Sequence, residues 1–119
     1  MTATHDDLES LKKRLRQFAA ERDWDQFHSP KNLSMALVVE ASELVEMFQW
    51  LTEKQSSELS PDTLREVEAK MADIFIYLIR MADKLNVNLA EAAERKIKQN
   101  ELKYPRDRVR GSSKKYSDY

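Results

Sequence analysis

Two glutamates, Glu40 and Glu43, stand three residues apart in the segment EASE, within a stretch that is otherwise mostly apolar. Residues at this spacing share one face of an α-helix, so both carboxylates would point the same way. At about 100° per residue, Glu40 falls within the stripe formed by the leucines of the same stretch. These are Leu33, Leu37, Leu44 and Leu51. A buried carboxylate without a partner is strongly destabilising, so this pair needs a cation.

Two kinds of cation would satisfy the pair. A hard divalent ion accepts carboxylate oxygens from two residues that face the same way. A lysine or arginine on a neighbouring helix would instead form two buried ion pairs. For an isolated E-x-x-E the ion pairs are the commoner explanation, because helices contain many such spacings by chance. The central position of Glu40 in the apolar stripe makes the two explanations about equal.

A second group of charges lies in EAKMADIFIYLIRMA, residues 68–82, where Asp73 interrupts an apolar run and Lys70 precedes it by one helical turn. On a helical wheel Asp73 faces away from the main apolar sector. The strip that it joins contains Glu66, Lys70, Tyr77 and Arg80. This strip is either a solvated face with an ordinary Glu66–Lys70 pair or the lining of a cleft.

A third group lies near the C-terminus, where Lys96 and Asn100 share a helical stripe with Ala93 and Ile97. A lysine in such a stripe can extend its ammonium to solvent. The alternative is that the lysine and the amide reach the same cleft as the acids. Acids and a lysine around one cleft would suit a metal-bridged phosphate ligand.

These side chains require helices to position them. Helical spacing and start signals predict helices over residues 5–22, 31–54, 61–85 and 88–103, with an aromatic-rich connection at 23–32 and a polar loop at 54–62. One glycine and three prolines are too few for a β fold. We therefore predict an all-α, antiparallel four-helix bundle subunit that oligomerises. The domain would span residues 1–105, and the polar tail 106–119 is expected to be mobile.

Composition narrows the classes of function. The 119 residues are 41% hydrophobic and 34% charged, yet the net charge is only −1, which does not favour a nucleic acid polymer as partner. No apolar run approaches the roughly 18 residues that a membrane span needs. The N-terminus has no apolar segment typical of a signal peptide, and the chain has no cysteine. We expect a cytoplasmic protein without membrane partners.

Three segments stand in order along the chain: EASELVEMFQW, MADIFIYL and KIKQNELKYP. Together they resemble the MazG-like all-α nucleoside triphosphate pyrophosphohydrolases. Two more segments, FAAERDWDQFHSPKNL and SSKKYSDY, narrow the resemblance to the dCTP pyrophosphatase branch. The resemblance implies a subunit that dimerises, commonly into a tetramer. It also implies Mg²⁺-dependent hydrolysis of a dNTP, dCTP-like or non-standard, to the dNMP and pyrophosphate.

The same resemblance implies roles for individual residues. Glu40, Glu43 and Asp73 match the metal ligands of the family. Positions around the base and sugar match Trp24, His28 and Trp50, and positions near the sugar and phosphates match Tyr77, Lys96 and Asn100. Aromatic rings give a base a stacking surface, which agrees with the first group. Trp50 could also be a core residue, and His28 could cap the segment that follows it.

One position departs from the family pattern. The motif on the third helix reads E-x-x-D, but its first acid is replaced by Lys70. An ammonium cannot ligate Mg²⁺ and would repel it. Glu46 or Glu66 could compensate, the metal count or activity could be reduced, or the ammonium could stand where a metal would. The last case predicts a nucleotide-binding or sensing bundle with weak catalysis, and it is the alternative to the enzyme.

Overall fold

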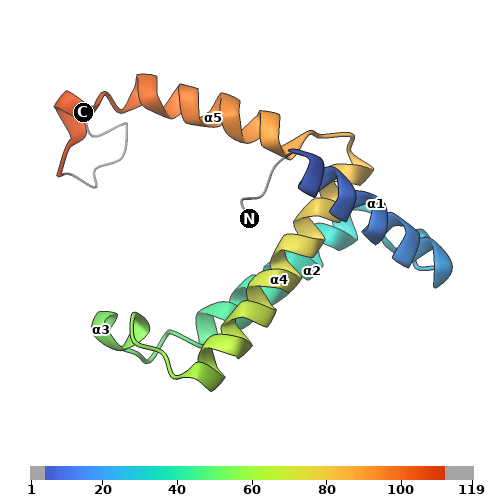
Figure 1. Cartoon of the computed structure of the whole chain (residues 1–119), viewed down its shortest axis with the longest axis horizontal. Coiled ribbons are helices and arrows are strands. Elements are labelled where there is room, and N and C mark those ends of the chain that lie inside the picture. Colours follow the sequence, from blue (N-terminus) through green and yellow to red (C-terminus); the bar gives the residue numbers. More distant parts are fainter. Residues whose placement is uncertain (1–4, 112–119) are drawn as a thin grey trace. The chain divides into compact units, whose positions relative to one another are not determined.

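The computed structural model describes residues 5–111, and within them every regular element is a helix (Figure 1). The all-α class is therefore confirmed. The longer helices are α1 (His5–Glu21), α2 (Pro30–Glu46), α4 (Pro61–Lys84) and α5 (Leu89–Lys103). Three short helices complete the described chain: η1 (Asp25–Phe27), α3 (Glu53–Ser56) and α6 (Arg106–Val109). The last of these lies within the stretch expected to be a mobile tail; residues 112–119 are outside the described part.

Side-chain caps set the starts of the three longer helices that follow α1, which are α2, α4 and α5. Ser29, Ser60 and Asn88 each accept a hydrogen bond from the backbone N–H three residues further on, at 3.0–3.2 Å. Proline follows Ser29 and Ser60 at the first helical position, where its missing N–H leaves no bond unmade. These local signals place α2, α4 and α5 along the chain.

The predicted helix over 31–54 is wrong at its C-terminal end. Helix α2 stops at Glu46, residues 47–50 form turns, and α3 begins after Thr52. The backbone N–H of Thr52 donates to Oε1 of Gln55, and the N–H of Gln55 donates to Oγ1 of Thr52. This reciprocal capping box starts a new helix, so the apolar spacing across residues 47–51 does not continue α2.

Two residues with positive φ end helices in place of glycine. Asp23 (φ 53°) follows α1, and its N–H donates to the carbonyl of Ala20 while the N–H of Trp24 donates to that of Ala19. Asn86 (φ 56°) follows α4. Aspartate and asparagine tolerate this left-handed conformation better than most residues. The turn at Asp23 directs the chain from α1 into η1.

The described chain divides into two compact units, one ending at Asn86 and the other starting at Val87. In the first unit α2 packs along α4, and α1 also contacts α4 (Figure 1). Helices α5 and α6 belong to the second unit. No helix among residues 5–111 is long and apolar enough to cross a membrane.

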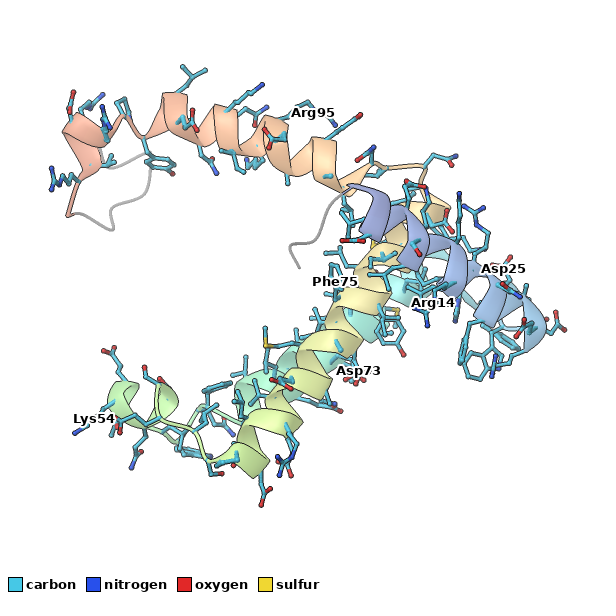
Figure 2. All side chains as sticks on the ribbon, viewed as in Figure 1. Arg14, Asp25, Lys54, Asp73, Phe75 and Arg95 are labelled. Carbon is cyan, nitrogen blue, oxygen red and sulfur yellow. The ribbon has the colours of Figure 1, made fainter. Side chains whose placement is uncertain are left out.

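The core of the first unit is small and leaves much apolar surface uncovered. Its buried hydrophobic residues are Ala19, Leu33, Val67, Ile79 and Ala82. Large side chains on α2 and α4 remain exposed, among them Val38 (61%), Met71 (55%) and Phe75 (42%; Figure 2). An apolar groove of about 530 Å³ runs beside Leu44, Met71, Phe75 and Leu78. Exposed apolar surface of this extent is typical of a face that another chain covers.

Candidate functional site

Lys70 of α4 lies between the two glutamates of α2. Its Nζ donates to Oε2 of Glu40 at 2.8 Å and to Oε2 of Glu43 at 2.6 Å. The side chains of Lys70 and Glu40 are 19% and 20% exposed, and that of Glu43 is 43% exposed. The two carboxylates raise the pKa of Lys70 above its ordinary value, chiefly through the hydrogen bond to Glu40. We call these three residues the glutamate–lysine cluster.

The cluster matches the ion-pair explanation of the E-x-x-E spacing. Both carboxylates converge on one cation, as a metal site would require, but that cation is an ammonium. Among the side chains that the structure describes, no group of three or more histidines and acids is close enough to hold a metal ion. As they stand, these residues do not fit a resident Mg²⁺, because a lysine nitrogen held by both carboxylates repels a second cation.

Asp73, the third predicted metal ligand, lies in a different setting. It is exposed on α4 (Figure 2) and makes no hydrogen bond or ion pair with another residue of the described chain. Glu46 and Glu66, the acids that could compensate for Lys70, are likewise exposed and unpaired within residues 5–111. The sequence-based Glu66–Lys70 pair is not formed, because Lys70 reaches α2 instead.

Asp73 lines a pocket of about 250 Å³ together with three residues predicted to bind substrate: Trp24, His28 and Tyr77. We call it the aromatic pocket. Its other lining residues are Leu15, Phe18, Ala19, Ile76 and Arg80. The strip of α4 that carries Asp73 and Tyr77 therefore lines a cleft, which was one of its two sequence-based interpretations.

Ring contacts position Trp24 and His28 on one wall of this pocket. The Trp24 ring lies edge-on to Phe18, with 5.7 Å between centroids, and 6.5 Å from the His28 ring. Arg22 places its guanidinium 3.6 Å from the centre of the Phe18 ring. The bend at Asp23 brings Trp24 back toward Phe18, so the helix end and the ring contacts act together.

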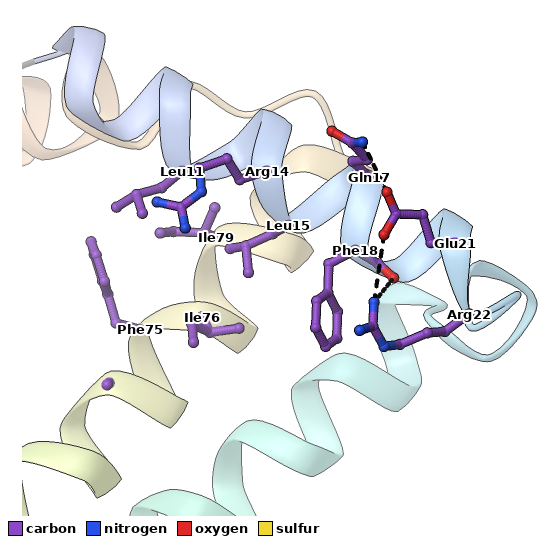
Figure 3. A pocket seen from close by; sticks show the side chains of 11 residues that line it. Leu11, Arg14, Leu15, Gln17, Phe18, Glu21, Arg22, Phe75, Ile76 and Ile79 are labelled. Carbon is purple, nitrogen blue, oxygen red and sulfur yellow. Dashed lines mark hydrogen bonds and ion pairs between the residues drawn. The ribbon is translucent and has the colours of Figure 1, made fainter.

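Phe18 also borders a larger pocket of about 520 Å³ between α1 and α4 (Figure 3). In it Leu11 and Leu15 of α1 face Ile76 and Ile79 of α4. Arg22 donates to the carbonyl oxygen of Phe18 at the edge of this pocket. Four polar side chains, Arg14, Gln17, Glu21 and Arg22, line it beside these apolar residues, but none of the residues predicted to bind substrate or metal does.

Sequence analysis missed the importance of Arg80. Its side chain is only 4% exposed, although it belongs to the polar strip of α4. It donates to Asp25 at 2.9 Å, to Asp83 at 3.3 Å and to Nδ1 of His28 at 3.4 Å. We call these four residues the arginine network. An arginine inside the apolar run YLIRMA was the available signal, because a buried guanidinium needs acidic partners.

Two further cations extend this network. Lys84 pairs with Asp25 at 2.7 Å, and Arg16 of α1 pairs with Asp83 at 2.6 Å. Hydrogen bonds from Lys84 and Arg80 lower the pKa of Asp25, and the hydrogen bond from Arg16 lowers that of Asp83. The pKa of His28 is lowered first by burial and then by the charge of Arg80. Ion pairs thus tie η1 and α1 to α4.

The remaining predicted substrate-binding residues lie outside the aromatic pocket. Trp50, in the turn after α2, is 87% exposed. Lys96 and Asn100 are exposed on α5, in the second unit. Their roles stay predictions.

Comparisons with known proteins agree with this architecture. Residues 35–119 match the MazG-like family. The dCTP pyrophosphatase 1 of Mus musculus is 41% identical over 113 residues, which cover 93% of this chain and 66% of the mouse protein. The human protein of the same name is 40% identical over equal shares. This chain therefore spans slightly less than two thirds of these relatives.

A solved structure adds the fold. A crystal structure of a pyrophosphatase from Archaeoglobus fulgidus superposes with a TM-score of 0.80 and is 38% identical. The match covers 88% of this chain and 98% of the archaeal chain. With the family match over most of its length, this chain belongs to the MazG-like family.

Proposed function

We propose that this protein is a nucleotide pyrophosphohydrolase that converts a dNTP, dCTP-like or non-standard, to the dNMP and pyrophosphate. The observation that carries the proposal is the aromatic pocket, which gathers Trp24, His28, Asp73 and Tyr77 in a chain of the MazG-like family. Relatives named dCTP pyrophosphatase 1 support a nucleotide as substrate. In the reaction, water cleaves the anhydride bond between the α- and β-phosphates of the dNTP, which releases the dNMP and pyrophosphate.

The pocket suits the base and sugar end of such a substrate. Its volume of about 250 Å³ is just below the range of roughly 300–1,000 Å³ common for small-molecule pockets, so it suits one part of such a substrate better than the whole. The rings of Trp24, His28 and Tyr77 offer apolar faces on which a base can stack. From the resemblance alone, Lys96 and Asn100 of α5 are proposed to lie near the sugar and phosphates of the substrate.

The test is an assay of pyrophosphate release from each of the four dNTPs, and from base-modified dCTP analogues, in the presence of MgCl₂. We expect release from at least one of them. If none is hydrolysed, the proposal is wrong. A matched variant, Trp24→Ala, should weaken substrate use, whereas Trp50→Ala tests whether the exposed tryptophan contributes at all.

Mg²⁺ dependence is a separate part of the proposal. It rests on the family resemblance and on the two carboxylates of Glu40 and Glu43, whereas the position of Lys70 opposes a metal resident between them. Nucleoside triphosphates carry Mg²⁺ on their phosphates, so a metal could enter with the substrate. Activity measured over a MgCl₂ titration against an EDTA control tests this dependence.

The alternative is a nucleotide-binding or sensing protein with weak or no catalysis. The Lys70 ammonium between Glu40 and Glu43 favours it, because it already offsets one of the two carboxylate charges. Calorimetric titration with a dNTP separates the two proposals. Tight binding without pyrophosphate release supports the alternative, and binding with release supports the enzyme.

We also propose that the subunit forms an antiparallel four-helix bundle that dimerises, with two dimers forming a tetramer. The exposed apolar side chains of α2 and α4 support an interface there. Sedimentation equilibrium of the whole chain tests the assembly, and Val38→Glu should weaken it.

We propose a cytosolic location, where the nucleotide substrate would be found. Cell fractionation tests this location.

A further inference from the structure

The contact between Arg80 and His28 restricts the chemistry of the imidazole. Arg80 donates from Nε to Nδ1 of His28 at 3.4 Å, and its Nη2 lies at the same distance from that nitrogen. A guanidinium has five N–H donors and no acceptor. Nδ1 of His28 must therefore be the acceptor, with its lone pair directed at Arg80.

Arg80 is held too firmly to turn away from the ring. Its side chain is 4% exposed, and it also donates to Asp25 at 2.9 Å and to Asp83 at 3.3 Å. Asp83 in turn pairs with Arg16, and Asp25 pairs with Lys84. A guanidinium bound by two carboxylates is restrained in orientation, so it directs its N–H groups at His28.

A neutral imidazole that accepts at Nδ1 carries its hydrogen on Nε2. The imidazolium would place a second N–H against the guanidinium, which is unfavourable for both charge and hydrogen bonding. Burial and the charge of Arg80 also lower the pKa of His28. The other charges that act on the ring are those of Asp25, which raises its pKa, and Lys84, which lowers it.

We infer that Arg80 is a positioning residue that holds His28 in its neutral Nε2–H form, so that the aromatic pocket offers a fixed hydrogen-bond donor to an oxygen acceptor of its ligand. The inference deepens the proposed function, on which its ligand part rests. The acceptor would be a carbonyl or hydroxyl oxygen on the base or sugar of a nucleotide. Arg80 itself need not touch the ligand.

The form of the ring can be read without turnover. Two-bond ¹H–¹⁵N correlation spectra of protein labelled with ¹⁵N-histidine distinguish protonated from unprotonated ring nitrogens. The chain contains two histidines, so the spectrum of a His5→Gln variant assigns His28. At neutral pH we expect Nε2 protonated and Nδ1 unprotonated. A charged ring or an Nδ1–H form in the unmutated protein would overturn the inference.

A double-mutant cycle tests the link to ligand binding. We expect Arg80→Leu to raise the KM for the dNTP about tenfold and to leave kcat nearly unchanged. In a His28→Phe background, which keeps a ring but has no nitrogen, the same change should have little further effect. Equal effects of Arg80→Leu in both backgrounds would contradict the inference. If Arg80→Leu does not fold, the spectrum of the unmutated protein decides.

The outcomes also separate this inference from the proposed function. The expected spectrum without hydrolysis of any dNTP would refute the enzyme and leave the Arg80–His28 arrangement intact. Hydrolysis with the wrong form of His28 would refute only the role of Arg80.

Discussion

Helix α4 carries two cations that differ in what they hold. Lys70 joins two glutamates of α2, and its side chain is 19% exposed. Arg80 joins Asp25 and His28, both in the α1–α2 connection, to Asp83 of its own helix, and its side chain is 4% exposed. Both residues form ion pairs. Lys70 lies between the two glutamates that were predicted to bind a metal, whereas Arg80 supports His28 in the wall of the aromatic pocket.

The difference follows from the chemistry of the two side chains. An ammonium is a compact charge that can take the place of a small cation between two carboxylates. A guanidinium is planar and directs several N–H groups at once, so a single Arg80 can bind two acids and a ring nitrogen. The lysine therefore offsets part of the charge of two glutamates, whereas the arginine fixes the orientation of its partners.

The largest effect is expected from Arg80→Leu, which removes the buried guanidinium shared by Asp25, Asp83 and His28. Breaking a buried ion pair typically lowers the free energy of unfolding by about 3–5 kcal/mol, and we expect the lower end of this range because Asp25 keeps Lys84 and Asp83 keeps Arg16. Urea unfolding followed by circular dichroism measures the change. Arg65→Leu is the control, because Arg65 forms an exposed pair with Asp62 on the same helix and should lose under about 1 kcal/mol. If Arg80→Leu and Arg65→Leu lower the free energy of unfolding equally, the burial of Arg80 does not make its ion pairs more stabilising than an exposed pair.

If the Mg²⁺ that enters with the dNTP is bound by Glu40, Glu40→Gln is expected to reduce dNTP hydrolysis about 100-fold while the helix content stays unchanged. Glutamine keeps the shape of the side chain but removes its charge, and Glu43 still pairs with Lys70. Pyrophosphate release and circular dichroism measure the two properties. Glu58→Gln, an exposed change outside the cluster, is the control. Activity near that of the unmutated protein would remove Glu40 from the site.

Lys70→Glu should convert the cluster into a site whose stability depends on metal. Three carboxylates repel one another in EDTA, and Mg²⁺ at 100 times its Kd would restore about 2.7 kcal/mol. Unfolding free energies in EDTA and in excess MgCl₂ test this. Lys70→Met removes the ammonium without adding an acid, so Mg²⁺ should stabilise this variant much less than Lys70→Glu. If Mg²⁺ stabilises the unmutated protein as strongly as Lys70→Glu, the ammonium does not exclude a metal.

The smallest effect concerns pH. Because the folded state lowers the pKa of His28 below its ordinary 6.5, the unfolded chain takes up this proton first as the pH falls. The stability that the neutral His28 ring contributes is therefore fully present above about pH 6.5. It is lost as the pH falls from there through the lower pKa of the folded state. Denaturation on either side of this value, with His28→Gln for comparison, should show a shallower dependence in the variant. The lowered pKa values of Asp25 and Asp83 act only below their ordinary 3.8, so they do not interfere.

Much of the fold followed from local chemistry. The caps Ser29, Ser60 and Asn88 act on backbone groups three residues away, so their helices could be placed from sequence. The end of α2 could not be placed this way. The apolar spacing across residues 47–51 continues, and only the capping box at Thr52 shows that the chain starts a new helix.

The candidate site was predictable in part. Trp24, His28 and Tyr77 meet in one pocket, as the resemblance implied that they share a substrate. Arg80 was missed because its strip on α4 has a polar side, and a helical wheel does not show what covers that side. Its burial depends on the α1–α2 connection folding over it.

By itself, the sequence determined the all-α class, the starts of the helices, the common face of Glu40 and Glu43, and the need of that face for a cation. Helical periodicity and capping act within one or two turns, so they are written in neighbouring residues. The tertiary structure decided which side chains of the described residues reach each other. Lys70 reaches the glutamates, and Arg80 reaches Asp25 and His28, because α4 packs against segments distant in the chain. Ion-pair partners across such distances are set by packing, not by spacing along one helix.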